Sequence, residues 1–377
     1  MTMKQTGAGV LWLALLGLGV ACSSSDDGKG GGSSGGDPVD TGEPDEDTGD
    51  PEVDCRGMVA ALSPEDAATG WFYRDSLTVT FEEIPEYEAV RLSLTTDLGD
   101  EVPFTVLWNE ENRLDAYLSA DLVGNAVYTL TASCENEMSA TFETDEFGAP
   151  METGATDLIG NVYELDLPNA EFTKPVGVGA LLGSYLSSPL LASIQEADEE
   201  TLTLLVAQGY WDEDRNPHQD MGTGCYDFPP ADFTASPFFA ADTDYINILY
   251  QSGSVEANIP MKDMRLEGTF SPNGDKMGGA WIGGLVDTSD LGPLLDLDAE
   301  AGVICEYISA FGLSCADCLG EIDCTVDEDG EPWDEETNPL PDSAECFCLY
   351  VEAHFNDAPL VEGMTIDPDP LGESDGG

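Results

Sequence analysis

The stretch LTVTF at Leu77–Phe81 decides the fold class, because its apolar side chains alternate with threonines. Alternation with a period of two is the pattern of a strand with one buried face. Three later stretches repeat it, at Val90–Leu94, Phe104–Trp108 and Val127–Thr131. Short strands separated by Pro, Gly, Asp and Asn predict a β-sandwich over residues 55–147.

Four motifs in this region follow one another in the order LSPEDA at Leu62–Ala67, LTVTFE at Leu77–Glu82, YTL at Tyr128–Leu130 and TFET at Thr141–Thr144. In this order they resemble the bacterial Ig-like domains of the S-layer-protein type (SbsA-like). The resemblance covers about a quarter of the chain. It implies a sandwich of about seven strands that acts as a spacer or an adhesive module. It carries over no catalytic residue.

A second domain, also mostly β, is predicted over residues 158–357. Asn273-Gly274 is a strong hairpin signal within it. Its best helix candidate is Ala299–Phe311, whose apolar face is formed by Ile304, Tyr307, Ile308 and Phe311. The predicted fold class is therefore mainly β: an Ig-like β-sandwich followed by a second mostly β domain with one or two short helices.

The N-terminus predicts export. Lys4 precedes an apolar run that ends in LWLALLGLGVAC at Leu11–Cys22, too short to span a bilayer and typical of a signal that is removed. Gly19-Val20-Ala21-Cys22 resembles the lipobox of bacterial lipoproteins, although Gly19 takes the usual leucine position and Leu18 lies one residue earlier. The resemblance implies that residues 1–21 are a lipoprotein signal peptide and that Cys22 is diacylated. An ordinary cleavable signal with a chance cysteine is the alternative.

The segments outside the two domains are acidic and poor in apolar residues. Residues 22–54 are rich in Gly, Ser and Pro and predict a disordered tether. Residues 148–157 form a short linker, and residues 358–377 predict a disordered acidic tail. We therefore expect a protein of the bacterial cell envelope, held by its lipid at the outer membrane or the cell surface.

Charge restricts the partners. The chain has 76 Asp+Glu against 11 Lys+Arg, a net charge of −65, so it repels phosphate backbones and nucleic acid is excluded as a partner. The membrane, through the lipid anchor, and other surface proteins or glycans remain. The predicted role is structural or binding rather than enzymatic. Two alternatives are a carrier whose hydrophobic ligand lies against residues 177–194, and an exported hydrolase that uses His218 or His354.

Ten cysteines fit an oxidising compartment. Cys55 and Cys134 are predicted to bridge within the first domain. Six more fall in a short stretch of the second domain, where fifteen pairings are open; they are Cys305, Cys315, Cys318, Cys324, Cys346 and Cys348. Cys346 and Cys348 are expected to bond to different partners, and Cys225 is the predicted free thiol. Zinc is the alternative use of the four thiols at Cys315, Cys318, Cys346 and Cys348.

No cofactor is predicted, with calcium as the alternative. Residues 325–336 partly match an EF-hand loop, and the candidate ligands are Asp327, Asp329 and Glu336. Thr325 occupies the first position, where the loop requires an aspartate.

Overall fold

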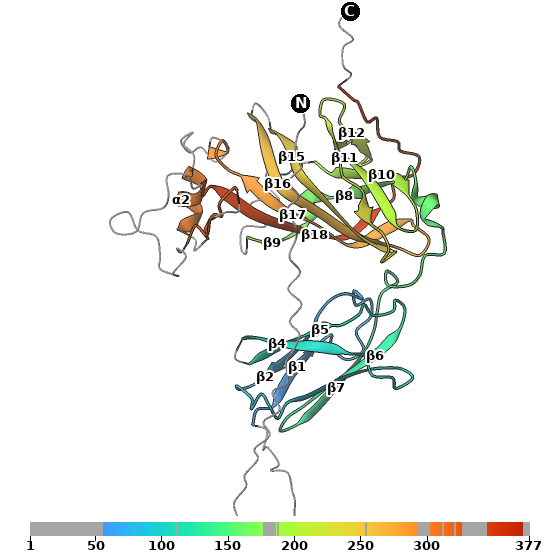
Figure 1. Ribbon diagram of the computed structural model, residues 1–377, viewed down its shortest axis with the longest axis vertical. Helices are drawn as coiled ribbons and strands as arrows, with labels where there is room; N and C mark the ends of the chain where they lie inside the picture. Colours follow the sequence, from blue (N-terminus) through green and yellow to red (C-terminus); the bar gives the residue numbers. More distant parts are fainter. Residues whose placement is uncertain are drawn as a thin grey trace, which may run out of the picture. The chain divides into compact units, whose positions relative to one another are not determined.

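The computed structural model describes residues 56–110, 112–175, 186, 188–252, 255–292, 302–310, 313–319, 322–325 and 345–371 (Figure 1). The predicted signal peptide, the predicted lipidation site Cys22 and the predicted tether lie outside these ranges. No helix within them has the length and apolar character needed to cross a membrane.

The first domain is a sandwich of two antiparallel sheets. Their strand orders are β1-β2-β5-β4 and β3-β6-β7, which is the arrangement of a constant-type immunoglobulin domain. The strands are β1 (Val59–Ser63), β2 (Leu77–Phe81), β3 (Arg91–Thr96), β4 (Phe104–Glu110), β5 (Arg113–Leu118), β6 (Val127–Ser133) and β7 (Glu137–Glu143). The predicted β-sandwich is confirmed.

The core of the first domain is formed by side chains that alternate along each strand between a buried and a more exposed position. In β2 the side chains of Leu77, Val79 and Phe81 are buried, while the threonines between them are partly exposed. Near the start of β6 the hydroxyl of Tyr128 accepts a hydrogen bond of 2.9 Å from the backbone N–H of Val123. This contact is the tyrosine corner of immunoglobulin-like domains, and the sequence analysis did not predict it.

The second domain contains one large antiparallel sheet with the order β8-β10-β11-β14-β15-β16-β17-β18-β9, and β12 and β13 pair with β11. Its elements are η1 (Ala155–Leu158), β8 (Val162–Leu165), η2 (Leu167–Asn169), β9 (Glu171–Lys174), β10 (Leu190–Ala197), β11 (Thr201–Trp211), β12 (Pro217–Gln219), β13 (Cys225–Asp227), β14 (Ala231–Asp232), β15 (Phe238–Ser252), β16 (Val255–Phe270), β17 (Lys276–Asp287), α2 (Val303–Ser309) and β18 (Cys348–Pro359). The predicted hairpin is confirmed, because Asn273-Gly274 joins β16 to β17.

The sheet curls around a large apolar core. Just beyond β18, Leu360 forms a bridge with Tyr163 of β8, so the first strand in the sheet order meets the chain that leaves the last strand but one. Tyr163, Phe233, Phe239 and Phe270 are all fully buried inside. The inward side chains of the described strands therefore pack in the core, and the outer face of the sheet presents side chains to solvent.

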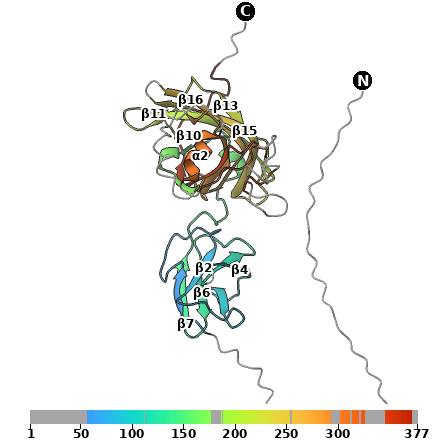
Figure 2. The ribbon, with the colours of Figure 1, turned by 90° about the vertical axis from the view of Figure 1, so that its left-hand side faces the viewer.

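Helix α2 covers one end of the curled sheet (Figure 2). Its buried side chains Ile304 and Ile308 pack with Leu349 and Val351 of β18. The predicted helix is confirmed over Val303–Ser309, but its predicted face is wrong at Tyr307, whose side chain is 45% exposed. The seven residues of the helix make about two turns, and its buried side chains are the i, i+4 pair Ile304 and Ile308.

The prediction of a disordered tail from residue 358 is wrong for its first part. β18 continues to Pro359, and Val361 donates a backbone hydrogen bond of 2.8 Å to Val162. Further along, Gln219 and Asp367 exchange two hydrogen bonds of 2.8 Å each. Paired backbone groups thus hold an acidic segment that has little apolar surface to bury.

Candidate binding site on the outer face of the second sheet

The outer face of strands β15 to β18 and of the adjoining β9 carries three cross-strand rows of side chains. Strand register places the following residues side by side: Asp242, Arg265, Gly283, Glu352 and Lys174 in the central row; Ala240, Glu267, Trp281, His354 and Glu171 in the second; Tyr245, Lys262, Leu285 and Tyr350 in the third. The side chains between them, such as Leu266, Ile282 and Ala353, point into the core.

A bulge is needed to bring the third row to this face. Asp263 has a φ of +48°, and the β16–β17 register shifts between Lys262 and Arg265. The extra residue of a bulge reverses the alternation of the strand. Lys262 and Arg265 therefore both point outward, although a regular strand would turn them to opposite faces.

The edge of the Trp281 indole approaches Gly283, two residues further along β17. A Cβ built on Gly283 would lie 2.3 Å from Cζ3 of Trp281 and 3.2 Å from the hydroxyl of Tyr350. Only a glycine leaves room for the indole in this position. The ring of Trp281 also lies nearly parallel to the neighbouring His354 ring, with centroids 6.2 Å apart.

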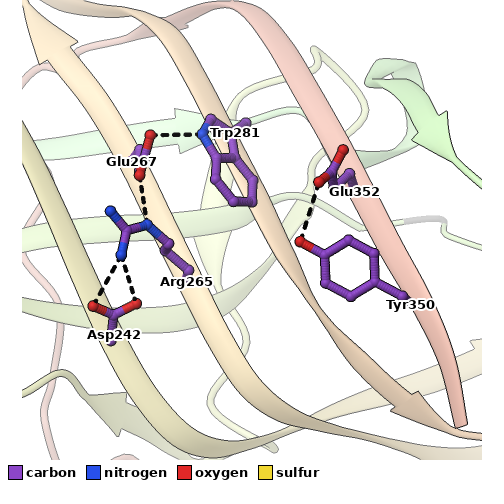
Figure 3. A network of polar contacts seen from close by, with 6 residues as sticks. All are labelled: Asp242, Arg265, Glu267, Trp281, Tyr350 and Glu352. Carbon is purple, nitrogen blue, oxygen red and sulfur yellow. Dashed lines mark hydrogen bonds and ion pairs between the residues drawn. The ribbon is translucent and has the colours of Figure 1, made fainter. Parts of the chain in front are cut away.

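Polar contacts fix the side chains around this indole (Figure 3). Glu267 accepts hydrogen bonds from Nε of Arg265 and, at 2.8 Å, from Nε1 of Trp281. Nη1 of Arg265 also lies 3.3 Å from both carboxylate oxygens of Asp242. One guanidinium thus joins two carboxylates on two strands, and one of these carboxylates holds the edge of the indole.

A second polar group borders the same glycine. Glu352 accepts hydrogen bonds from Nζ of Lys174 at 2.9 Å, from the Tyr350 hydroxyl at 3.1 Å and from Thr173 at 3.2 Å. The ammonium of Lys174 lies 5.1 Å from the centre of the Tyr350 ring. We call Trp281, Tyr350, Gly283 and the groups that hold them, Asp242, Arg265, Glu267, Glu352 and Lys174, the Trp281 platform.

The charges of the platform stabilise one another. Partial burial alone raises the pKa of Glu352, but hydrogen bonds from Lys174 and Tyr350 outweigh it and lower the pKa below its usual value. Burial, followed by the contact with Glu352, raises the pKa of the Tyr350 phenol, so this hydroxyl remains a donor. The platform thus combines three acidic and two basic side chains that contact one another.

A hollow adjoins the platform on the β15 side. It has a volume of about 430 Å³, within the range of ligand pockets, and Asp242 and Arg265 form part of its wall. Its other lining residues come from the segment around β14 and the start of β15, namely Pro229, Pro230, Ala231, Asp232, Ala235, Phe238 and Ala240.

The sequence analysis proposed none of the platform residues as a site, and it considered the neighbouring His354 only as a catalytic base. The signal was present at alternate positions: Arg265 and Glu267, Trp281 and Gly283, and Tyr350 and Glu352 are pairs two residues apart in their strands. The sequence alone does not give the strand register that places these pairs side by side.

The six cysteines between 305 and 348 form three disulfides, which are Cys305–Cys315, Cys318–Cys348 and Cys324–Cys346. Cys346 and Cys348 bond to different partners and Cys225 is free, as predicted. The zinc alternative is wrong, because all four proposed thiols are oxidised. Asp287 lies close to the sulfurs of Cys318 and Cys348, but a disulfide offers no thiolate to a metal.

Two predicted sites cannot be placed. Cys134 is disulfide-bonded, but Cys55 lies outside the described residues, so their pairing stays a prediction. The calcium candidates Asp327, Asp329 and Glu336 also lie outside them. Of the segment 177–194, the described residues Leu190–Ile194 are buried in β10, and most of the remainder lies outside.

Both histidines lie near an aspartate, but no hydrogen bond joins either of them to a serine among the described residues. Nε2 of His218 lies 3.2 Å from Asp212, and its ring packs beside Tyr210. His218 borders a hollow of about 480 Å³ whose lining residues include no serine. The ring of His354 packs beside that of Trp281, next to the platform.

No family model matches the chain, and no curated protein matches it significantly. Among solved structures, an L,D-transpeptidase from Mycobacterium smegmatis is similar to it at 10% identity and a TM-score of 0.22, over 57% of this chain and 76% of that one. The LD transpeptidase LdtMt1 in complex with imipenem has 13% identity and a TM-score of 0.22, over 44% and 80%. The S-layer protein rSbsC(31-844) has 10% identity and a TM-score of 0.19, over 62% and 48%. Similarity at this level supports no statement about function.

Proposed function

We propose that this chain is a lipid-anchored protein of the bacterial cell envelope with a binding rather than an enzymatic role. Cys22 holds it at the membrane, residues 23–54 are the tether, the Ig-like domain is a spacer, and the second domain carries the binding surface. The observation that carries the proposal is the Trp281 platform, an ordered group of aromatic and charged side chains on an otherwise ordinary outer sheet face.

The disulfides support the location. Three closed bridges within 44 residues are typical of proteins that fold outside the reducing cytoplasm. The net charge of −65 supports a lipid rather than a basic surface as the means of attachment, since an anionic membrane repels the chain.

Labelling with radioactive palmitate in a bacterial host, followed by detergent phase partition, tests the anchor. We expect label and detergent partition in the wild type and in Cys225→Ser, which removes the free thiol, and neither in Cys22→Ser. The matched cysteine variant controls for the loss of a sulfur. An unlabelled wild-type protein in the aqueous phase, with a mature N-terminus other than Cys22, would contradict the proposal.

A further inference from the structure

The Trp281 platform combines a flat aromatic ring with fixed hydrogen-bonding groups. The Cζ3 edge of the Trp281 indole approaches Gly283, and one face of the ring is turned toward the viewer in Figure 3. Such a face has negative partial charge and attracts the weakly positive C–H groups of a ligand. Tyr350, 38% exposed, adds a second ring beside the same glycine.

The groups around the ring are suited to hydroxyls. Asp242, Glu267 and Glu352 present acceptors, and Arg265, with 42% of its side chain exposed, presents donors. These side chains are already oriented by one another, so binding costs little side-chain entropy. A ligand that offers paired hydroxyl groups can both donate to a carboxylate and accept from the guanidinium.

The charge of the platform argues for a neutral ligand. Acids outnumber bases about sevenfold in the whole chain, yet here three carboxylates face two cations. An anionic polymer would be repelled by the rest of the chain. A cationic ligand would gain more at the many unpaired surface acids than at carboxylates that Arg265 and Lys174 already hold.

From this geometry we infer that the Trp281 platform binds an uncharged oligosaccharide, with one pyranose ring stacked on Trp281 and its neighbour reaching the hollow beside Asp242 and Arg265. β-1,4-linked chains are the favoured class, because their equatorial substituents leave flat C–H faces for the indole. The inference rests on the binding role proposed above and specifies its ligand class.

Isothermal titration calorimetry with cellohexaose and N-acetylchitohexaose tests the inference on full-length Cys22→Ser protein, which lacks the lipid. We expect at least one of the two sugars to bind the parent protein. Trp281→Ala should weaken that binding at least tenfold. Trp281→Phe, which keeps a flat ring, should weaken it less. Tyr210→Ala removes an exposed aromatic from another part of the second domain and leaves the affinity unchanged.

Gly283→Ala supplies an independent variant. Its new methyl group would lie within 2.3 Å of Cζ3 of Trp281, so the indole must lift and the affinity falls, although every polar group remains. Near-UV circular dichroism and the melting temperature report whether each variant is folded. Raising sodium chloride from about 0.05 to 0.5 M leaves binding of a neutral sugar nearly unchanged.

Three outcomes would overturn the inference: neither sugar binds the folded parent protein, binding survives Trp281→Ala undiminished, or affinity collapses with salt. Because the protein used lacks the lipid, such a result leaves the palmitate experiment untouched. Failure of the anchor in turn leaves sugar binding measurable.

Discussion

Asp145 follows β7 at the end of the Ig-like domain, and its carboxyl is about half buried. Burial raises its pKa to about 6, a hydrogen bond from the backbone N–H of Phe147 opposes the rise, and the neighbouring Asp75 and Glu146 add to it. An unfolded aspartate titrates near pH 4. Between about pH 4 and 6 the folded protein therefore holds a proton that the unfolded chain releases. The stabilisation from protonated Asp145 is complete below pH 4 and is lost as the pH rises through 6.

Asp145→Asn keeps an oxygen to accept from Phe147 but carries no charge. We expect the free energy of unfolding to rise by about 1–2 kcal/mol at pH 7, less than the full shift implies because solvent screens a half-exposed group. The gain should vanish below pH 4, where the aspartate is itself neutral. Urea unfolding across pH 3.5–8 measures it.

The exposed Glu137→Gln is the matched control, since it removes one carboxylate from β7 of the same domain. If both variants gained equally at pH 7, general charge repulsion and not the environment of Asp145 would be the cause.

At the scale of elements, the β16–β17 hairpin depends on the conformation of one residue. Gly274 has a φ of +72°, and a Cβ on it would lie 3.0 Å from Cδ2 of Leu158. Its carbonyl accepts a hydrogen bond of 2.8 Å from the buried Tyr163 hydroxyl, which holds the turn against the core. Gly274→Ala should therefore cost about 1–2 kcal/mol of stability.

Thermal and urea unfolding measure this cost. Gly224→Ala is the control, because its φ is not positive and no atom lies within 4 Å of the added methyl group. We expect the control to be neutral or slightly stabilising, because alanine lowers the conformational entropy of the unfolded chain. An equal loss in both variants would mean that the left-handed conformation of Gly274 contributes nothing particular.

Elements governed by local pattern were predictable from the sequence. The alternation in β2 and the turn residues Asn273-Gly274 each fix their structure within a few residues. α2 was predicted too long, because its end depends on the sheet that it covers. The bulge at Asp263 has no sequence signature of its own, and without it the outward positions of β16 cannot be assigned past that residue.

The candidate site could not be predicted, because it depends on contacts between distant strands. Asp242, Glu267 and Glu352 belong to a chain with 76 acids, where a single carboxylate carries no information. Disulfide pairing was undecided for a related reason: fifteen pairings of six nearby cysteines differ little in loop entropy, so packing chooses among them.

At the scale of the whole molecule, charge dominates the electrostatics. The net charge is −65, and only a few of the acids of the described residues are paired with a Lys or Arg, as in the platform. Repulsion among so many like charges opposes the compact state, and salt reduces it by shortening the Debye length from about 10 Å at 0.1 M to about 3 Å at 1 M. General screening thus acts gradually over hundreds of millimolar.

We therefore expect the melting temperature to rise steadily with sodium chloride and calcium to add little once salt is high. A specific calcium site behaves differently, because it stabilises by mass action at low millimolar calcium even in about 0.5 M salt. The acids are spread along the chain, and the one EF-hand-like loop has Thr325 where its first ligand belongs, so screening should account for the stabilisation. Differential scanning calorimetry in about 0.5 M sodium chloride, with and without calcium at matched ionic strength, separates general screening from a specific calcium site. A calcium-dependent rise of several degrees that Asp327→Ala or Glu336→Ala abolishes would instead place a real site at residues 325–336.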